Sequence, residues 1–284
     1  MKEKKYFLSG FADEASTDIK GQIKVMKENG LSALELRGVG GKNVTELSIS
    51  EFESIVRSLN DASLYISSIG SPIGKIDIDD DFERHFDIFK KLVEFADISS
   101  TKYMRIFSFY GVDSDEKEIE VYRRLNILSE YAKGAGVILC HENEKGIFGE
   151  TPENCLKIFS NVQGIRGVFD PANFVQCGVD TKVAWDMLSE HIEYLHIKDA
   201  LADKSVVPAG IGIGNLEYVM SQYSKTGKNL YSLEPHLRIF EGFSKLEREN
   251  EKTCELSSYT FDSGADAFRA SANAAKEILN KIYR

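Results

Sequence analysis

The sequence has few of the residues that mark secreted or membrane-spanning proteins. Its four cysteines, Cys140, Cys155, Cys177 and Cys254, lie far apart and form no C-x-x-C pair, which argues against a zinc ribbon or a disulfide framework. No apolar run approaches the roughly 18 to 20 residues that cross a bilayer, and the start MKEKKYFLSGFADE turns acidic before a signal-peptide core can form. We therefore expect a cytoplasmic protein with no membrane contact.

Long runs of basic residues are also missing. The formal net charge is −10 and no Lys/Arg run is longer than a pair, so the chain would repel a phosphate backbone. This composition argues against nucleic acid as a partner, although it leaves room for a local basic pocket that binds a small anion. Hydrophobic residues make up 42% and charged residues 28%, which are the proportions of a soluble globular protein.

Short β-branched or aromatic runs alternate with longer segments of helical period along the chain, a pattern typical of a parallel sheet with crossover helices. Eight runs are candidate strands, and no low-complexity linker separates two parts. A chain of 284 residues with eight such units predicts an α/β fold, a (β/α)8 TIM barrel, as a single domain over residues 1–284. The expected strands are Tyr6–Phe11, Ala33–Arg37, Leu64–Ile69, Tyr103–Phe109, Val137–Glu142, Gly167–Asp170, Tyr194–Lys198 and Leu230–Glu234.

Helical segments are expected between these strands. Several begin at a plausible N-cap, such as Thr151 followed by Pro152. The least regular stretch, 236–262, is expected to be a long βα loop over the C-terminal face of the barrel. The expected helices cover 18–30, 50–60, 82–98, 116–135, 151–160, 181–190, 214–226 and 264–282.

Four consecutive expected strands end in side chains that bind metals. Glu142 ends LCHE, Asp170 lies in VFDPAN, His196 in YLHIKD and Glu234 in SLEPH. The carboxyl ends of neighbouring parallel strands converge at the top face of a barrel, so these residues should cluster. One such carboxylate would most simply cap a helix or pair with a lysine, but four on successive strands favour a metal. An imidazole with three carboxylates predicts one divalent ion, with Mn²⁺ or Mg²⁺ favoured and Zn²⁺, Co²⁺ or Fe²⁺ also compatible.

The chain resembles the sugar phosphate isomerase/epimerase-like branch of the xylose isomerase-like TIM barrels over nearly its whole length. The resemblance rests on GFADE, ELRGVGGKN, IGSPIGKI, RIFSFY, HENEKGIFGETPE, FDPANFVQCG, HIKDA and SLEPHL. It implies that Glu142, Asp170, His196 and Glu234 are the metal ligands and that the two glutamates also form the acid/base pair. It further implies a small carbohydrate substrate and a homo-oligomer. Known members include ketose 3-epimerases, hydroxypyruvate isomerases, inosose dehydratases and 3-dehydroshikimate dehydratases.

Chemistry at such a site would begin with removal of a proton next to a ketone. A divalent ion bound to the carbonyl and adjacent hydroxyl oxygens stabilises the resulting enediolate. Glu142 and Glu234, on opposite sides of the ion, would take the proton from one face and return one to the other face or to the neighbouring carbon. The main hypothesis is therefore a metal-dependent isomerase or epimerase. The same enediolate can expel a β-hydroxyl, so a dehydratase of the inosose or 3-dehydroshikimate type is the alternative.

Two further classes fit less well. Endonuclease IV shares this barrel, but it needs a three-metal site rich in histidines and this chain has five histidines in all. A non-catalytic sugar-binding protein would have no need of both glutamates. Of the remaining histidines, His85 and His191 are expected at the surface, and strand alternation points His141 away from the pocket.

Several polar residues near the expected strand ends are candidates for substrate binding. Asn173 stands three residues after Asp170, where related epimerases and dehydratases often carry a histidine; an amide can hydrogen-bond a substrate oxygen but cannot shuttle a proton. For the basic candidates, ordinary ion pairing is an equally simple interpretation. The orientation of Asp13 and Glu14, at the end of the first strand, stays open. The other candidates are Arg37, Arg105, Lys198, Asp199 and His236.

Overall fold

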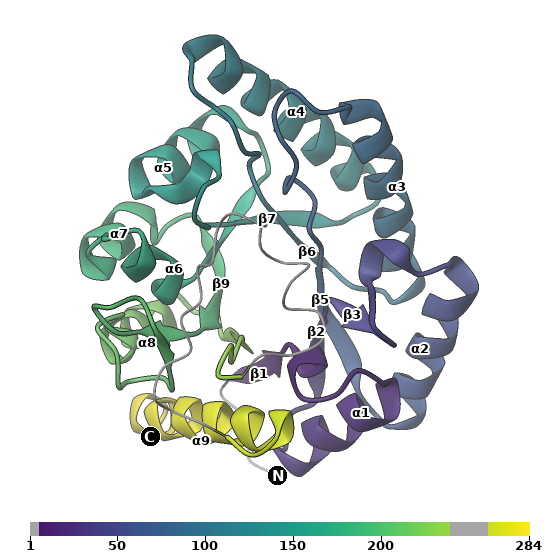
Figure 1. The fold of residues 1–284 in the computed structure, drawn as a ribbon, viewed down its shortest axis with the longest axis vertical. Helices are drawn as coiled ribbons and strands as arrows, with labels where there is room; N and C mark the ends of the chain where they lie inside the picture. The colour runs from purple at the N-terminus through teal and green to yellow at the C-terminus, as the bar shows by residue number, and fades with distance from the viewer. Residues whose placement is uncertain (1–5, 239–260) are drawn as a thin grey trace.

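The computed structural model describes residues 6–238 and 261–284, and in these ranges eight parallel strands form a ring surrounded by helices (Figure 1). The order around the ring follows the order along the chain, and contacts between the first and second strands close it. This arrangement confirms the expected (β/α)8 barrel. The strands are β1 (Phe7–Gly10), β2 (Ala33–Leu36), β5 (Tyr65–Gly70), β6 (Tyr103–Ile106), β7 (Ile138–Glu142), β8 (Arg166–Phe169), β9 (Ile192–Ile197) and β12 (Leu230–Leu233).

The helices outside the ring lie where the sequence predicts them, to within a few residues. Most begin at a Ser, Thr or Asp whose side chain accepts a hydrogen bond from the first turn, for example Ser48, Asp81 and Thr151. They are α1 (Ile19–Glu28), α2 (Ile49–Asp61), α3 (Phe82–Ile98), α4 (Asp115–Gly134), α5 (Pro152–Asn161), α7 (Thr181–Leu188), α8 (Leu216–Ser224) and α9 (Gly264–Ile282).

Several short elements were not predicted. They lie in the loops at the strand ends and at the starts of helices. They are the helix α6 (Pro171–Gln176), the antiparallel pairs β3 (Gly38–Val39) with β4 (Lys42–Asn43) and β10 (Asp199–Ala200) with β11 (Val206–Val207), and the 3-10 turns Ala12–Glu14, Val44–Glu46 and Phe148–Glu150.

The apolar core lies mainly between the ring of strands and the surrounding helices. Phe52 of α2 and Phe95 of α3, for example, stack with ring centroids 4.0 Å apart, and both are fully buried. Inside the ring, toward the carboxyl ends of the strands, the buried residues are instead charged, among them Glu35, Arg105 and Glu142. A buried charge is costly unless it is paired, so we expect a functional site in this polar layer.

The prediction that His85 lies at the surface was wrong. Its side chain, on α3, is 8% exposed and its Nε2 accepts a hydrogen bond from the backbone N–H of Gly74, 2.9 Å away. The helix therefore holds the loop that follows β5. His191 is partly buried and stacks on Phe159 with 4.9 Å between ring centroids.

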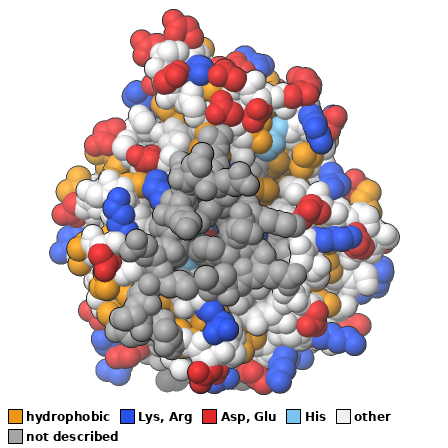
Figure 2. Space-filling view, viewed as in Figure 1, with side chains coloured by type: hydrophobic (Ala, Val, Ile, Leu, Met, Phe, Trp, Pro, Cys, Tyr) orange, Lys and Arg blue, Asp and Glu red, His pale blue; other side chains and the backbone are white. Residues whose placement is uncertain are grey.

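The expected loop 236–262 lies largely outside the described residues, since 239–260 are not described. On the described part of the face in Figure 2, acidic and basic side chains are interspersed rather than gathered into one basic stripe. None of the helices in the described ranges combines the length and the apolar character needed to cross a membrane.

Candidate metal centre

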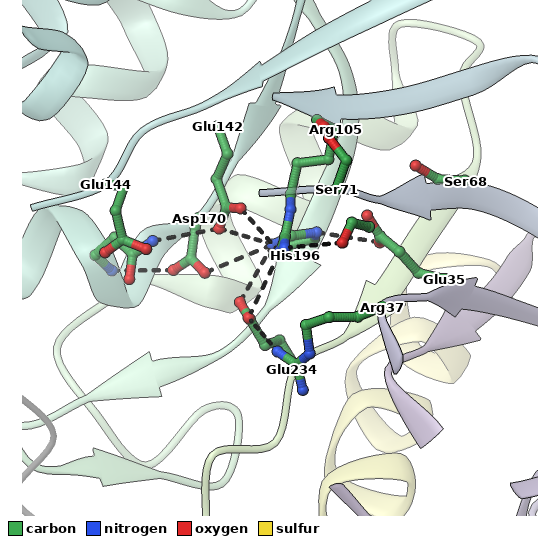
Figure 3. A network of polar contacts seen from close by, with 12 residues as sticks. Glu35, Arg37, Ser68, Ser71, Arg105, Glu142, Glu144, Asp170, His196 and Glu234 are labelled. Atoms are coloured by element: carbon green, nitrogen blue, oxygen red, sulfur yellow. Dashed lines mark hydrogen bonds and ion pairs between the residues drawn. The ribbon is translucent and has the colours of Figure 1, made fainter. Parts of the chain in front are cut away.

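Four side chains from neighbouring parts of the ring meet at the carboxyl ends of the strands. Glu142 ends β7, Asp170 follows β8, His196 lies in β9 and Glu234 follows β12 (Figure 3). Each offers one ligand atom, and these atoms all lie within 4.8 Å of one another. All four residues are at most 3% exposed. The sequence-predicted ligand set is therefore brought together in one buried cluster.

Local structure leaves one carboxylate oxygen of Asp170 for the cluster. Its Oδ1 accepts a hydrogen bond of 2.9 Å from the backbone N–H of Asn173 and so caps α6, in which Pro171 takes the first position. Its Oδ2 lies 3.8 Å from His196 Nδ1 and 2.9 Å from Lys198 Nζ. The D-P-A-N sequence thus ends a strand, starts a helix and directs the second oxygen into the site.

The imidazole of His196 lies at the centre of the cluster. Its Nδ1 is 3.0 Å from Glu142 Oε1, 3.3 Å from Glu234 Oε2 and 3.8 Å from Asp170 Oδ2. Burial alone would lower the pKa of His196, but the surrounding carboxylates, Glu142 first, raise it well above its ordinary value. Three carboxylates therefore surround one ring nitrogen and attract a positive charge to that point.

The donor set fits a divalent metal ion. Glu142 Oε2 and Asp170 Oδ2 are buried and accept no hydrogen bond from the described residues, although Arg105 Nη1 lies 3.2 Å from the first and Lys198 Nζ 2.9 Å from the second. Burial raises the pKa of Glu142 despite His196 and Arg105. Oxygen atoms with spare lone pairs beside one imidazole nitrogen are the ligands of Mg²⁺, Mn²⁺ or Zn²⁺ in proteins.

Arg105 and Lys198 contact the carboxylates of the cluster directly. Arg105 Nη1 lies 3.2 Å from Glu142 Oε2 and 3.8 Å from Glu234 Oε1. Lys198 Nζ lies 2.9 Å from Asp170 Oδ2 and 2.9 Å from Glu234 Oε2. Burial favours the neutral form of Glu234, but Lys198 and the nearby histidines hold its pKa well below the ordinary value. These cations line the cluster, and their role in substrate binding stays a prediction.

Arg37 joins the end of β1 to the ligand set. It binds both oxygens of Asp13 (2.9 and 3.0 Å), and it lies 3.1 Å from Glu14 Oε1 and 3.3 Å from Glu234 Oε1. Burial raises the pKa of Glu14 to about 8 despite this arginine. His236 Nε2 is 3.4 Å from Glu14 and 3.5 Å from Glu234, so these three also form a cluster, but Arg37 lies against both of its carboxylates.

The remaining predicted substrate residues have partners within the protein. Asn173 donates to Asn143 O at 2.9 Å and to Glu142 Oε1 at 3.3 Å, so its amide helps to orient the Glu142 carboxylate. The carboxylate of Asp199 accepts four backbone hydrogen bonds of 2.9 to 3.0 Å and anchors the glycine-rich loop after β11. This is a structural role that the sequence did not suggest. The donors are the N–H groups of Ala200, Gly210, Gly212 and Gly214.

Two acidic residues near the four-residue cluster were not among the predicted site residues. Glu144 pairs with Lys75 at 2.9 Å at the edge of the cluster. Glu35, in β2, is 1% exposed and lies 3.1 Å from His196 Nε2. A signal for Glu35 was present, because it is a charged residue inside the apolar strand A-L-E-L, where an unpaired carboxylate would be costly.

Comparisons with known proteins agree with this architecture. The family model described as Xylose isomerase-like TIM barrel matches residues 23–255. No curated protein gives a significant sequence match.

Three similar solved structures illustrate the range of relatives. The probable 3-DHS dehydratase AsbF from Bacillus anthracis is 17% identical, with a TM-score of 0.72 over 95% of this chain and 98% of that one. A D-tagatose 3-epimerase-like protein is 16% identical, with a TM-score of 0.72 over 98% of both chains. The IOLI protein, solved with a bound zinc atom, is 15% identical, with a TM-score of 0.74 over 97% of this chain and 99% of that one. At these identities the likeness shows the fold alone.

Proposed function

The chain belongs to the xylose isomerase-like TIM barrel family, and on that premise we propose that it is a divalent-metal-dependent isomerase or epimerase of a small polyhydroxy ketone. Glu142, Asp170, His196 and Glu234 would hold the ion, and Glu142 and Glu234 would also transfer the proton. The observation that supports this most is that each glutamate has one oxygen beside His196 Nδ1 and the other beside an arginine. Solved relatives described as a D-tagatose 3-epimerase-like protein and as an L-ribulose 3-epimerase agree with this reaction class.

Each glutamate divides its two oxygens between two neighbours. Glu142 directs Oε1 to His196 Nδ1, 3.0 Å away, and Oε2 to Arg105, 3.2 Å away. Glu234 directs Oε2 to His196 Nδ1, 3.3 Å away, and Oε1 to Arg37, 3.3 Å away. A carboxylate in this place can bind an ion through one oxygen and accept or return a proton through the other.

The neighbouring residues support proton transfer in this place. A bound divalent ion would supply the positive charge that favours loss of a proton next to a carbonyl group. Asn173 holds Glu142 through Oε1, and Arg105 faces both glutamates. Because every residue of the cluster is buried, these charges act in a medium that screens them less than water does.

Hydrogen exchange tests the proposed reaction. The metal-loaded protein would be incubated in D₂O with a panel of ketoses, inososes and dehydroshikimate, and the products followed by NMR. Deuterium next to the carbonyl without loss of water is the expected result. An enone or deoxy product would instead identify a dehydratase, which begins with the same proton removal.

Matched variants test the two glutamates. At saturating metal, Glu142→Gln and Glu234→Gln should each lower exchange at least about 10²-fold, the usual contribution of a general base or acid. Glu144→Gln is the control, because Glu144 is a partly buried glutamate that lies near the cluster and pairs with Lys75. It should stay within a few-fold of the wild-type rate. Near wild-type exchange by either test variant would exclude a mechanism with two glutamates.

A further inference from the structure

The imidazole of His196 has a second carboxylate partner on its far side. Its Nε2 lies 3.1 Å from Glu35 Oε2, whereas its Nδ1 faces Glu142, Asp170 and Glu234. In Figure 3, Glu35 lies on the opposite side of the ring from Glu142 and Asp170. Glu35 is therefore in contact with one ligand of the cluster without belonging to the set of four.

Glu35 is itself held in one orientation. Its Oε1 accepts a hydrogen bond of 2.7 Å from the hydroxyl of Tyr194, which also lies 3.1 Å from Ser68 Oγ. Because the tyrosine hydroxyl donates to Glu35, Ser68 is the donor in the second contact. All of these residues are at most 1% exposed. A chain of buried hydrogen bonds thus runs from Ser68 through Tyr194 and Glu35 to His196.

Strand geometry explains why these residues meet. Tyr194 and His196 are two residues apart in β9, so their side chains share the inward face. The pairing of β2 with β5 shifts its register between Leu34 and Glu35, which places Glu35 opposite Ser68. Glu35 then reaches across the interior of the barrel to a strand that is not its neighbour in the sheet.

We propose that Glu35 is a positioning residue that accepts a hydrogen bond from the Nε2–H group of His196 and so directs the lone pair of Nδ1 toward the metal site. A neutral imidazole carries its proton on one nitrogen and has a lone pair on the other. A fixed acceptor at Nε2 selects the tautomer whose free nitrogen faces Glu142, Asp170 and Glu234. It also fixes the ring plane, and it makes Nδ1 a stronger ligand. The inference rests on the proposed metal site but not on the identity of the reaction.

Metal affinity is the first test. Loss of a carboxylate that orients a metal-bound histidine typically lowers metal affinity 10–100-fold. Isothermal titration with Mn²⁺ or Zn²⁺ should therefore show at least about tenfold weaker binding for Glu35→Gln. Glu144→Gln is the matched control, because it neutralises a partly buried glutamate near the cluster that pairs with Lys75. The metal affinity of this variant should stay within about threefold of wild type.

The tautomer of His196 is the second test, because a merely structural role for Glu35 would not change it. The protein would be labelled with ¹⁵N-histidine and loaded with Zn²⁺, and its five histidines compared by NMR. Wild type should show His196 with Nε2–H and a metal-bound Nδ1, and Glu35→Gln should lose that protected Nε2–H signal. A metal-bound Nε2 in wild type, or Glu35→Gln affinity within threefold of wild type, would overturn the inference.

Two further outcomes keep the inferences separate. If the wild-type protein binds no divalent metal, the proposed metal site fails and the positioning role falls with it. If wild type binds metal and Glu35→Gln binds it equally well, only the role of Glu35 fails.

If Glu35→Gln does not fold, Tyr194→Phe provides the test, because it removes the donor that orients Glu35. A few-fold weaker metal binding by Tyr194→Phe supports the inference, and unchanged binding contradicts it.

Discussion

Replacing Lys198 with methionine should strengthen metal binding, although this residue lies within the site. Its ammonium group is 2.9 Å from both Asp170 Oδ2 and Glu234 Oε2, which belong to two of the three carboxylates of the cluster. Burial favours neutral lysine, but Asp170 and Glu234 outweigh it and hold the pKa of Lys198 well above its ordinary value. The ammonium therefore stays charged, and it repels any cation that approaches the same oxygens.

The size of this repulsion follows from the contact distances. An ion bonded to either oxygen at about 2.2 Å would lie within about 5 Å of Lys198 Nζ, given the 2.9 Å contacts. A divalent and a monovalent charge about 5 Å apart repel by roughly 1.7 kcal/mol even with the screening of bulk water, and by several times more inside a protein. Proton uptake by the two carboxylates offsets part of the gain. We expect metal binding at least about tenfold tighter, which is about 1.4 kcal/mol.

Isothermal titration of Lys198→Met with Mn²⁺ or Mg²⁺ measures this effect. Lys75→Met is the matched control, because Lys75 is also largely buried and lies 2.9 Å from a carboxylate, but that carboxylate belongs to Glu144. The control should change affinity by less than about threefold. Unchanged or weaker binding by Lys198→Met, with a folded protein, would refute the idea that the lysine competes with the ion for Asp170 and Glu234.

Two other predictions concern stability. Burial and, to a smaller extent, Arg124 lower the pKa of His85 to about 4. Below pH 6.5 the unfolded chain therefore binds more protons than the folded protein. The free energy of unfolding should fall by up to about 3 kcal/mol as the pH drops to 4. In His85→Gln the amide oxygen can still accept a hydrogen bond from Gly74. Urea unfolding of this variant should show a smaller loss of stability at acid pH than wild type, and an equal loss in both proteins would contradict this prediction. Gly212→Ala should cost about 1–3 kcal/mol, since its Cβ would lie 2.3 Å from an Asp199 oxygen, whereas Gly134→Ala, with nothing within 4 Å, should not destabilise.

The barrel and the clustering of Glu142, Asp170, His196 and Glu234 could be predicted because their signals are local. Strand and helix periods, N-caps and the D-P-A-N sequence each depend on residues within a few positions of one another. Parallel topology then brings strand ends together without further information, as for Glu142 and Glu234. The predicted strand Tyr103–Phe109 was too long, because β6 ends at Ile106.

The contacts that were missed depend on register and on the path of loops. Glu35 meets His196 because the β2–β5 pairing shifts by one residue, which the sequence of β2 does not reveal. Asp199 was correctly placed near the strand end, but its carboxylate binds the backbone of glycines 11 to 15 residues further on. His85 faces a loop N–H rather than solvent for the same reason. Each of these contacts joins segments whose relative position is set by the fold as a whole.

Whether Glu142, Asp170, His196 and Glu234 bind a divalent ion can be measured by X-ray diffraction from crystals grown with saturating Mn²⁺. Data collected on both sides of the manganese absorption edge locate the ion without reference to the protein atoms. We predict one anomalous peak, at bonding distance from a carboxylate oxygen of each of the three acidic residues and from Nδ1 of His196. The Nε2 atom of His196 should face Glu35. A peak at another place, or none at saturating Mn²⁺ in crystals whose four side chains are ordered, would contradict the proposed metal centre.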